Sequence, residues 1–211
     1  SSIMVATCIS ILAVDFPVYP RRFAKAERFG TGLMDIGVGA FIVSAGLVSG
    51  LTSNRKKGSR RSLRDTAVST SPMLLLGLLR FLAMKGVQYQ EHVSEYGTHW
   101  NFFLTIASTT VLNALLRPLL PQKTSLLAGL ALMAGYQRLL STGLTEYIMS
   151  APREGFFGHN REGVCGCAGF LALHLMSHGI GEELQVFTAD SRGGMLHRRW
   201  RWNAIFLVCL D

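Results

Sequence analysis

Charged residues are scarce in this chain of 211 residues, where Lys, Arg, Asp and Glu together make up 16% of the sequence. Ordinary soluble domains carry about 25%. Apolar residues make up 49% and the mean hydropathy is +0.30. They fall in blocks of 17 to 22 residues separated by short charged loops, and a helix needs about 20 apolar residues to cross a bilayer. The composition therefore excludes an ordinary soluble domain and predicts a membrane protein.

Other signals are missing as well. The four cysteines, Cys8, Cys165, Cys167 and Cys209, lie in apolar stretches, which indicates small buried side chains and not a disulfide framework. The glycines of GTGLMDIGVG (30–39) do not follow a strand, so they do not predict a dinucleotide site. The sequence begins inside one apolar run and ends inside another. We therefore expect it to be a fragment of a longer protein.

The apolar blocks predict an all-α fold, a polytopic transmembrane helix bundle with five complete and two truncated spans. All of it is expected to form a single membrane-embedded domain over residues 1–211. The predicted spans are 3–14 (truncated), 31–52, 71–87, 99–117, 124–141, 162–181 and 202–210 (truncated). Between them, 53–70 is expected to be a basic cytosolic loop and 182–201 a second cytosolic loop.

The loops differ in charge between the two sides of the predicted bundle. Loops that alternate along the chain must face the same side, which groups 15–30, 85–98 and 142–161 against 53–70, 118–123 and 182–201. The second group, counted with Arg117, holds twelve basic and four acidic residues, net +8, whereas the first holds seven of each, counted with Arg161 and Glu162. Basic loops tend to stay in the cytosol, so the first group is predicted to be luminal. Because the basic residues are dispersed and lack interleaved aromatics, no nucleic-acid partner is expected.

The predicted luminal side carries most of the chemically capable side chains. At DFPVYPRRFAKAE (15–27) the sequence resembles the inositol acyltransferases of glycosylphosphatidylinositol-anchor synthesis, the PIG-W/GWT type. Further matches follow in GTGLMDIGVG (30–39), KGVQYQEHVSEYGTHWNFF (85–103), LTEYIMSAPREG (144–155) and NREG (160–163). The resemblance covers most of residues 5–181 and is specific only because these motifs occur together.

The resemblance implies a multi-pass enzyme of the endoplasmic reticulum membrane with its catalytic loops on the luminal side. Such proteins transfer a fatty acyl group, usually palmitoyl, from acyl-CoA to an inositol hydroxyl of glucosaminyl-phosphatidylinositol. Acyl-CoA would be a co-substrate, with no tightly bound cofactor and no metal, and the glycolipid and membrane lipids would be the other partners. The family pattern places catalytic Asp and Lys residues at positions that match Asp15 and Lys25.

The chemistry of acyl transfer suits these two residues. Asp15 follows the apolar run 3–14 directly, and a carboxylate partly withdrawn from water is a stronger base. We expect Asp15 to take the proton of the inositol hydroxyl and Lys25 to stabilise the oxyanion or to orient Asp15. The alternative is a salt bridge at the membrane boundary that only anchors the loop.

The remaining candidates are assigned to substrate binding. Arginine binds phosphate with two donors, so Arg21 and Arg22 are expected to hold the lipid phosphate, unless they are only an interfacial pair. Either His92 or His99 is a rival for the role of base. The predicted lining of the substrate pocket consists of Glu91, His92, His99 and Asn101, with Glu146, Tyr147, Arg153 and Arg161 as its second wall. Asn160 and Glu162 are explained equally well as the start of a helix.

Some polar residues lie within the predicted spans. Unpaired charges in a membrane usually face a partner or a hydrated cavity, so an Asp35–Arg80 pair is one prediction. His174 and His178 share a helix face, but no carboxylate lies within the span 162–181 to complete a metal site. Two other functions stay open, namely a secondary transporter of a small anionic or lipid substrate, with Asp35 and Arg80 in its path, and a non-catalytic scaffold subunit.

Overall fold

The computed structural model describes residues 2–20, 32, 36–53, 63–85, 96–121 and 123–190. The described residues contain helices and no strands. The α-helices are α1 (Ser2–Ala13), α2 (Ile36–Leu51), α3 (Leu63–Lys85), α5 (Phe102–Leu116), α6 (Ser125–Leu139), α7 (Thr145–Ser150) and α8 (Gly155–Asp190). A 3-10 turn, η3 (Arg117–Leu119), follows α5, and a π-helical turn, η4 (Leu140–Leu144), joins α6 to α7. The all-α prediction is confirmed.

Three of these helices are long and apolar enough to cross a membrane: Arg64–Ala83, Phe102–Leu119 and Gly155–Gln185. The shorter apolar helix Ile36–Leu51 lies beside them. In lipid every backbone amide must be bonded within the protein, which leaves the helix as the form for each apolar block. The chain is therefore a membrane helix bundle, as predicted.

Helices α3 and α8 are longer than the hydropathy predicted. Helix α3 begins at Leu63, inside the segment 53–70, and α8 extends from Gly155 to Asp190, inside the segment 182–201. These helices therefore extend beyond the predicted span limits at 71 and 181. Hydropathy indicates where a helix leaves the apolar layer, but the helix itself can continue into the polar segment, where Glu, Leu and Gln are good helix formers. The span predicted at 202–210 lies outside the described residues.

A proline lies inside α3 without ending the helix. Pro72 has no N–H, so the carbonyl of Val68 loses its usual helical donor. The hydroxyl of Ser71 donates to that carbonyl at 2.9 Å. The adjacent serine thus replaces the missing hydrogen bond, which explains how the helix continues through Pro72.

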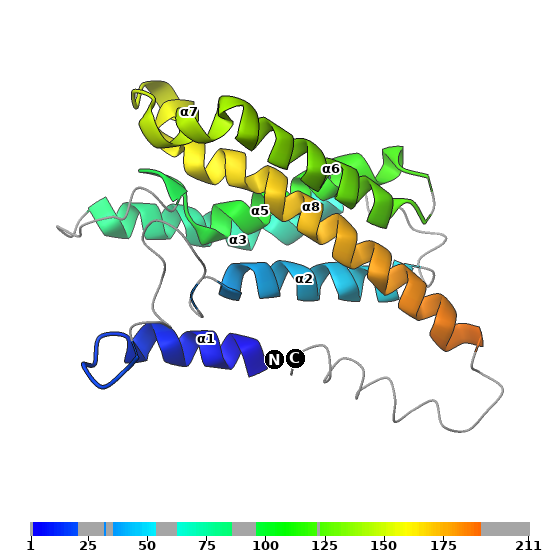
Figure 1. Ribbon diagram of the computed structural model, residues 1–211. Coiled ribbons are helices and arrows are strands. Elements are labelled where there is room, and N and C mark those ends of the chain that lie inside the picture. The colour runs from blue at the N-terminus through cyan, green and yellow to red at the C-terminus, as the bar shows by residue number, and fades with distance from the viewer. Residues whose placement is uncertain are drawn as a thin grey trace.

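Helix α8 is the centre of the bundle and packs against α2, α5 and α6, as Figure 1 shows. The backbones approach closely at glycines: a Cβ on Gly50 of α2 would lie 2.1 Å from the His178 carbonyl oxygen of α8, and one on Gly179 of α8 would lie 2.5 Å from the backbone nitrogen of Leu126 on α6. Small residues allow this kind of packing in membranes. Helix α3 packs against α5, and its leucines are largely exposed, as expected of a surface that faces lipid.

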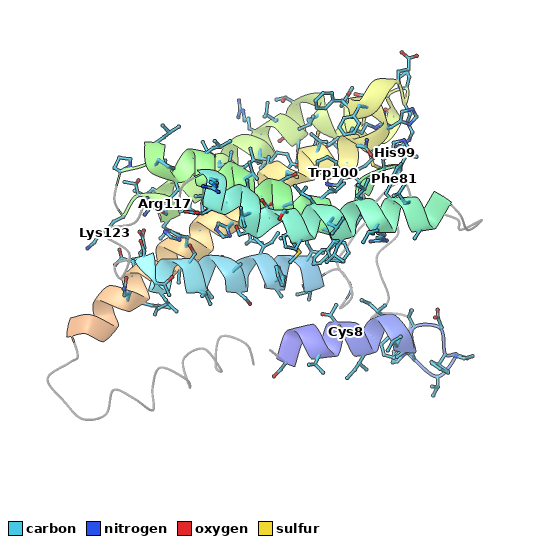
Figure 2. All side chains as sticks on the ribbon, turned by 180° about the vertical axis from the view of Figure 1, so that it is seen from behind. Cys8, Phe81, His99, Trp100, Arg117 and Lys123 are labelled. Atoms are coloured by element: carbon cyan, nitrogen blue, oxygen red, sulfur yellow. The ribbon has the colours of Figure 1, made fainter. Side chains whose placement is uncertain are left out.

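The connections alternate between the two ends of the bundle. Figure 2 shows Phe81, His99 and Trp100 together at one end, here called the His99 end, and Arg117 and Lys123 at the other, the Arg117 end. Helix α7 and the turn after α1 also lie at the His99 end, on opposite sides of the bundle (Figure 1). The described connections therefore divide between the two sides as the sequence predicted, whereas the luminal assignment of the His99 end stays a prediction.

Candidate functional site

The His99 end is built where the segment before α5 lies on the first turns of α8. The backbone N–H of Thr98 donates to the His159 carbonyl at 2.8 Å, and the N–H of His99 donates to Asn160 Oδ1 at 2.8 Å. Gly97 makes this approach possible, because its φ of +94° and a Cβ position 2.4 Å from the His159 oxygen both exclude a side chain. These contacts join residues about sixty positions apart in the sequence.

Asn160 is the residue that fixes this junction. It is fully buried, and its φ of −123° and ψ of 18° interrupt the helical geometry of α8. Its Oδ1 accepts from His99, and its Nδ2 donates to the Phe156 carbonyl at 2.9 Å. A new helical segment thus starts at Asn160, as the sequence indicated, but its acceptor oxygen bonds the His99 N–H of another segment and does not cap its own helix.

The hydrogen bonds that Thr98 and His99 make to His159 and Asn160 are here called the clamp. The clamp brings two imidazole rings together. His99 and His159 have ring centroids 5.9 Å apart at an angle of 40°, and Phe81 of α3 contacts His99 edge-on at 5.1 Å. Both histidines are partly exposed. Histidine is the side chain that most often serves as a general acid or base in enzymes, so this pair is a candidate for acid–base chemistry at the end of the bundle.

Asn101, predicted to line the substrate pocket, bonds the protein itself. It is 4% exposed, and its Oδ1 caps α5 by accepting from the N–H of Leu104 at 3.1 Å. Its Nδ2 donates to the Gly77 carbonyl of α3 at 3.0 Å. Both ends of the amide are thus used in holding α5 against α3, which is a structural role beside the histidine pair.

Two predicted arginines are also bonded internally. Arg153 makes two contacts with the Glu162 carboxylate, at 2.5 and 3.3 Å. Arg161 is 4% exposed and donates to the carbonyls of Ala151 and Pro152, which follow α7. These interactions fix the turn between α7 and α8. Because both guanidinium groups are already bonded within the protein, neither is freely available to bind an anion.

Helix α7 forms the outer edge of this end. Glu146 and Tyr147 are both exposed, and the Tyr147 ring lies 5.9 Å from the Arg161 guanidinium. That distance is within the range of a cation–π contact. Tyr147, Arg153 and Arg161 therefore lie at the same end of the bundle as His99, whereas their role as a wall of the substrate pocket stays a prediction.

Asp15 lies in the exposed turn that follows α1. This turn is held by Tyr19, whose hydroxyl donates to Ser10 Oγ at 2.6 Å. Since the turn and α7 lie on opposite sides of the bundle (Figure 1), the described structure does not bring Asp15 together with Tyr147. The predicted residues Arg21, Arg22, Lys25, Asp35, Glu91 and His92 lie outside the described residues, so the Asp15–Lys25 and Asp35–Arg80 pairs stay predictions.

Comparisons with known proteins agree with this architecture. The model of the GWT1 family matches residues 1–210. This chain belongs to the GWT1 family. It is 43% identical over 183 residues to GPI-anchored wall transfer protein 1 of Yarrowia lipolytica, covering 85% of this chain and 38% of that protein. It is 38% identical over 223 residues to the phosphatidylinositol-glycan biosynthesis class W protein of Dictyostelium discoideum, covering 86% and 45% respectively.

The chain thus spans less than half of the length of these GWT1-family relatives. The match confirms the resemblance that the motifs predicted. His159 was missed as a candidate residue, although it directly precedes the NREG motif. No local pattern indicates it, because its importance comes from its contact with His99 across sixty residues.

Metal binding has no support from the described side chains, among which no group of three His, Cys, Asp or Glu residues is placed to hold an ion. His178 does have a carboxylate neighbour: Glu182 Oε1 lies 3.4 Å from its Nε2. The sequence argument missed this contact because it ended the span at residue 181. That carboxylate is already bonded by Arg117 at 2.6 Å.

Proposed function

We propose that the GWT1-family protein represented by this chain acts in glycosylphosphatidylinositol-anchor biosynthesis in the endoplasmic reticulum membrane. It would transfer a palmitoyl group from acyl-CoA to an inositol hydroxyl of glucosaminyl-phosphatidylinositol. The family match over residues 1–210 carries this proposal. The printed names of the relatives, which refer to anchored wall transfer and to phosphatidylinositol-glycan biosynthesis, support it.

The reaction requires a base, an oxyanion partner and a membrane boundary. The base removes the proton of the inositol hydroxyl, whose oxygen then attacks the thioester carbonyl. A cation stabilises the tetrahedral oxyanion, which collapses to the ester. The CoA thiolate leaves and recovers the proton from the base. No tightly bound cofactor is required, since acyl-CoA supplies the acyl group as co-substrate.

Two assignments of the base remain in competition. In the first, Asp15 is the base and Lys25 the oxyanion partner, with Arg21 and Arg22 on the lipid phosphate. In the second, His99 is the base, and its position beside His159 supports this choice. Both put the chemistry at the His99 end, which is proposed to face the lumen.

Acyl transfer by the purified full-length protein tests the function. Radiolabelled palmitoyl-CoA is supplied with glucosaminyl-phosphatidylinositol, and label in the lipid product supports the enzyme. Uptake of label into proteoliposomes without formation of product would identify a transporter. If neither transfer nor uptake is observed, a scaffold subunit is the remaining possibility. Asp15→Asn and His99→Gln, compared in protein that reaches the membrane, decide the base. A variant that retains the full rate removes its residue from that role.

A further inference from the structure

A second polar cluster lies on α8, toward the Arg117 end. His174, His178 and Glu182 are spaced four residues apart, so they share one face of the helix. They are exposed by 9%, 5% and 9% respectively, in a helix otherwise apolar enough to span a membrane. We call these three residues the α8 polar column. None of them belongs to the His99 end or to the proposed transfer chemistry.

The outer part of the column is bonded to neighbouring elements. Arg117, at the end of α5, donates from Nη2 to Glu182 Oε1 at 2.6 Å and from Nε to His178 Nε2 at 3.1 Å. Ser53, after α2, donates to Glu182 Oε1 at 3.4 Å. Side-chain exposure falls from 24% at Arg117 through 11% at Glu182 to 6% at His178. The outer part of the column therefore begins near the surface and leads inward as far as His178.

The Arg117 contact determines where the proton of the His178 imidazole is. A guanidinium only donates, so His178 Nε2 accepts and its Nδ1 carries the proton. His174 Nε2 belongs to the next histidine on this face of α8, about one helical turn away.

Three buried atoms of the column have no protein partner among the described residues: His174 Nε2, His178 Nδ1 and Glu182 Oε2. Of these, His178 Nδ1 is a donor and the Glu182 carboxylate oxygen is an acceptor. Buried polar groups in proteins are nearly always hydrogen-bonded. An anion would suit only His178, and a cation would be opposed by the His178 N–H and by Arg117. A buried donor and a buried acceptor on the same helix face require a neutral partner that both donates and accepts.

We propose that the α8 polar column is a hydration site inside the helix bundle. Ordered water accepts from His178 Nδ1, donates to Glu182 Oε2 and is the partner of His174 Nε2 in either tautomer, since water both donates and accepts. The eight residues from Glu182 to His174 correspond to about 12 Å along the helix axis. Water thus enters the bundle from the Arg117 end to the level of His174, whatever reaction the protein catalyses.

Cysteine alkylation in the full-length protein tests this proposal. In a background in which serine replaces the native cysteines, His178→Cys and His174→Cys are treated in membranes with a small, water-soluble, membrane-impermeant thiol reagent. Alkylation requires a hydrated thiolate, so both should react about tenfold faster than a cysteine in an apolar contact. Leu175→Cys is the matched control, because Leu175 is 2% exposed and lies between the two histidines in sequence.

Equal, slow labelling at all three positions would overturn the proposal. Because replacing His178 also removes a partner of Arg117, a second measurement uses the unmutated protein. A map detailed enough to show ordered solvent should contain spherical density within hydrogen-bonding distance of His178 Nδ1 and His174 Nε2. Ordered histidine side chains with no such density would equally overturn it.

Discussion

Replacing Asn160 tests whether the clamp at the His99 end is what holds α8 to the segment before α5. Asn160→Ala removes the acceptor of the His99 N–H and the donor to the Phe156 carbonyl. Leaving a buried polar group without a partner costs about 1–3 kcal/mol. Because both partners are only partly buried, we expect a loss in the lower half of the summed range, about 2–4 kcal/mol.

The free energy of unfolding is measured by denaturant titration of the purified full-length protein in detergent, followed by circular dichroism. Asn160→Asp has nearly the same shape and keeps the acceptor for His99, but it loses the donor and places a carboxylate at a fully buried position, so it should also destabilise the protein. Asn113→Ala is the control, since Asn113 Oδ1 has no protein partner among the described residues, and it should change stability by less than Asn160→Ala. An Asn160→Ala protein as stable as the unmutated one would refute the clamp.

Three further predictions concern stability, measured in the same titration. Gly97→Ala should destabilise the protein by about 1–2 kcal/mol from the positive φ of Gly97 alone. The close contact of the new Cβ with the His159 carbonyl should add to this loss. An unchanged midpoint of the denaturant titration would contradict the backbone geometry described at Gly97. Gly50→Ala should separate α2 from α8 and destabilise the protein, whereas Gly135→Ala, where nothing lies within 4 Å of the new Cβ, should not. Arg153→Ala should cost about 3 kcal/mol by leaving the carboxylate of Glu162, 8% exposed, without its closest partner; equal stability of Arg153→Ala and Arg153→Lys would contradict that pairing.

The sequence predicted the helices better than their ends. Asn101 precedes FFLTIASTTVLNALL, and an Asn before an apolar run is a helix-start signal, so its capping role was open to prediction. The extension of α8 past residue 181 was not read from hydropathy, because that quantity reports depth in the membrane. Glu182 lies four residues after His178. A prediction that extended the helix past residue 181 would have placed both side chains on one helix face and so indicated their contact.

The candidate site, too, could be predicted from the sequence only in part. The sequence was sufficient to predict that Tyr147, Arg153 and Arg161 lie at the same end of the bundle as His99, because alternating spans put their loops on one side. The hydrogen-bond partners of these residues were not predicted. Arg153 bonds Glu162 and Arg161 bonds the carbonyls after α7, so residues expected to bind substrate are used within the protein. Side-chain pairing depends on backbone positions that no local pattern specifies.

By itself the sequence determined that this chain is a bundle of membrane helices with its loops on alternating sides. Apolar blocks of span length in lipid have no other way to bond their backbone amides. Only the tertiary structure decided that His159 and Asn160 meet His99, and that Arg117 reaches His178 and Glu182. Those contacts join residues about sixty positions apart, and they depend on how closely the helices approach, which glycines such as Gly97 and Gly50 permit.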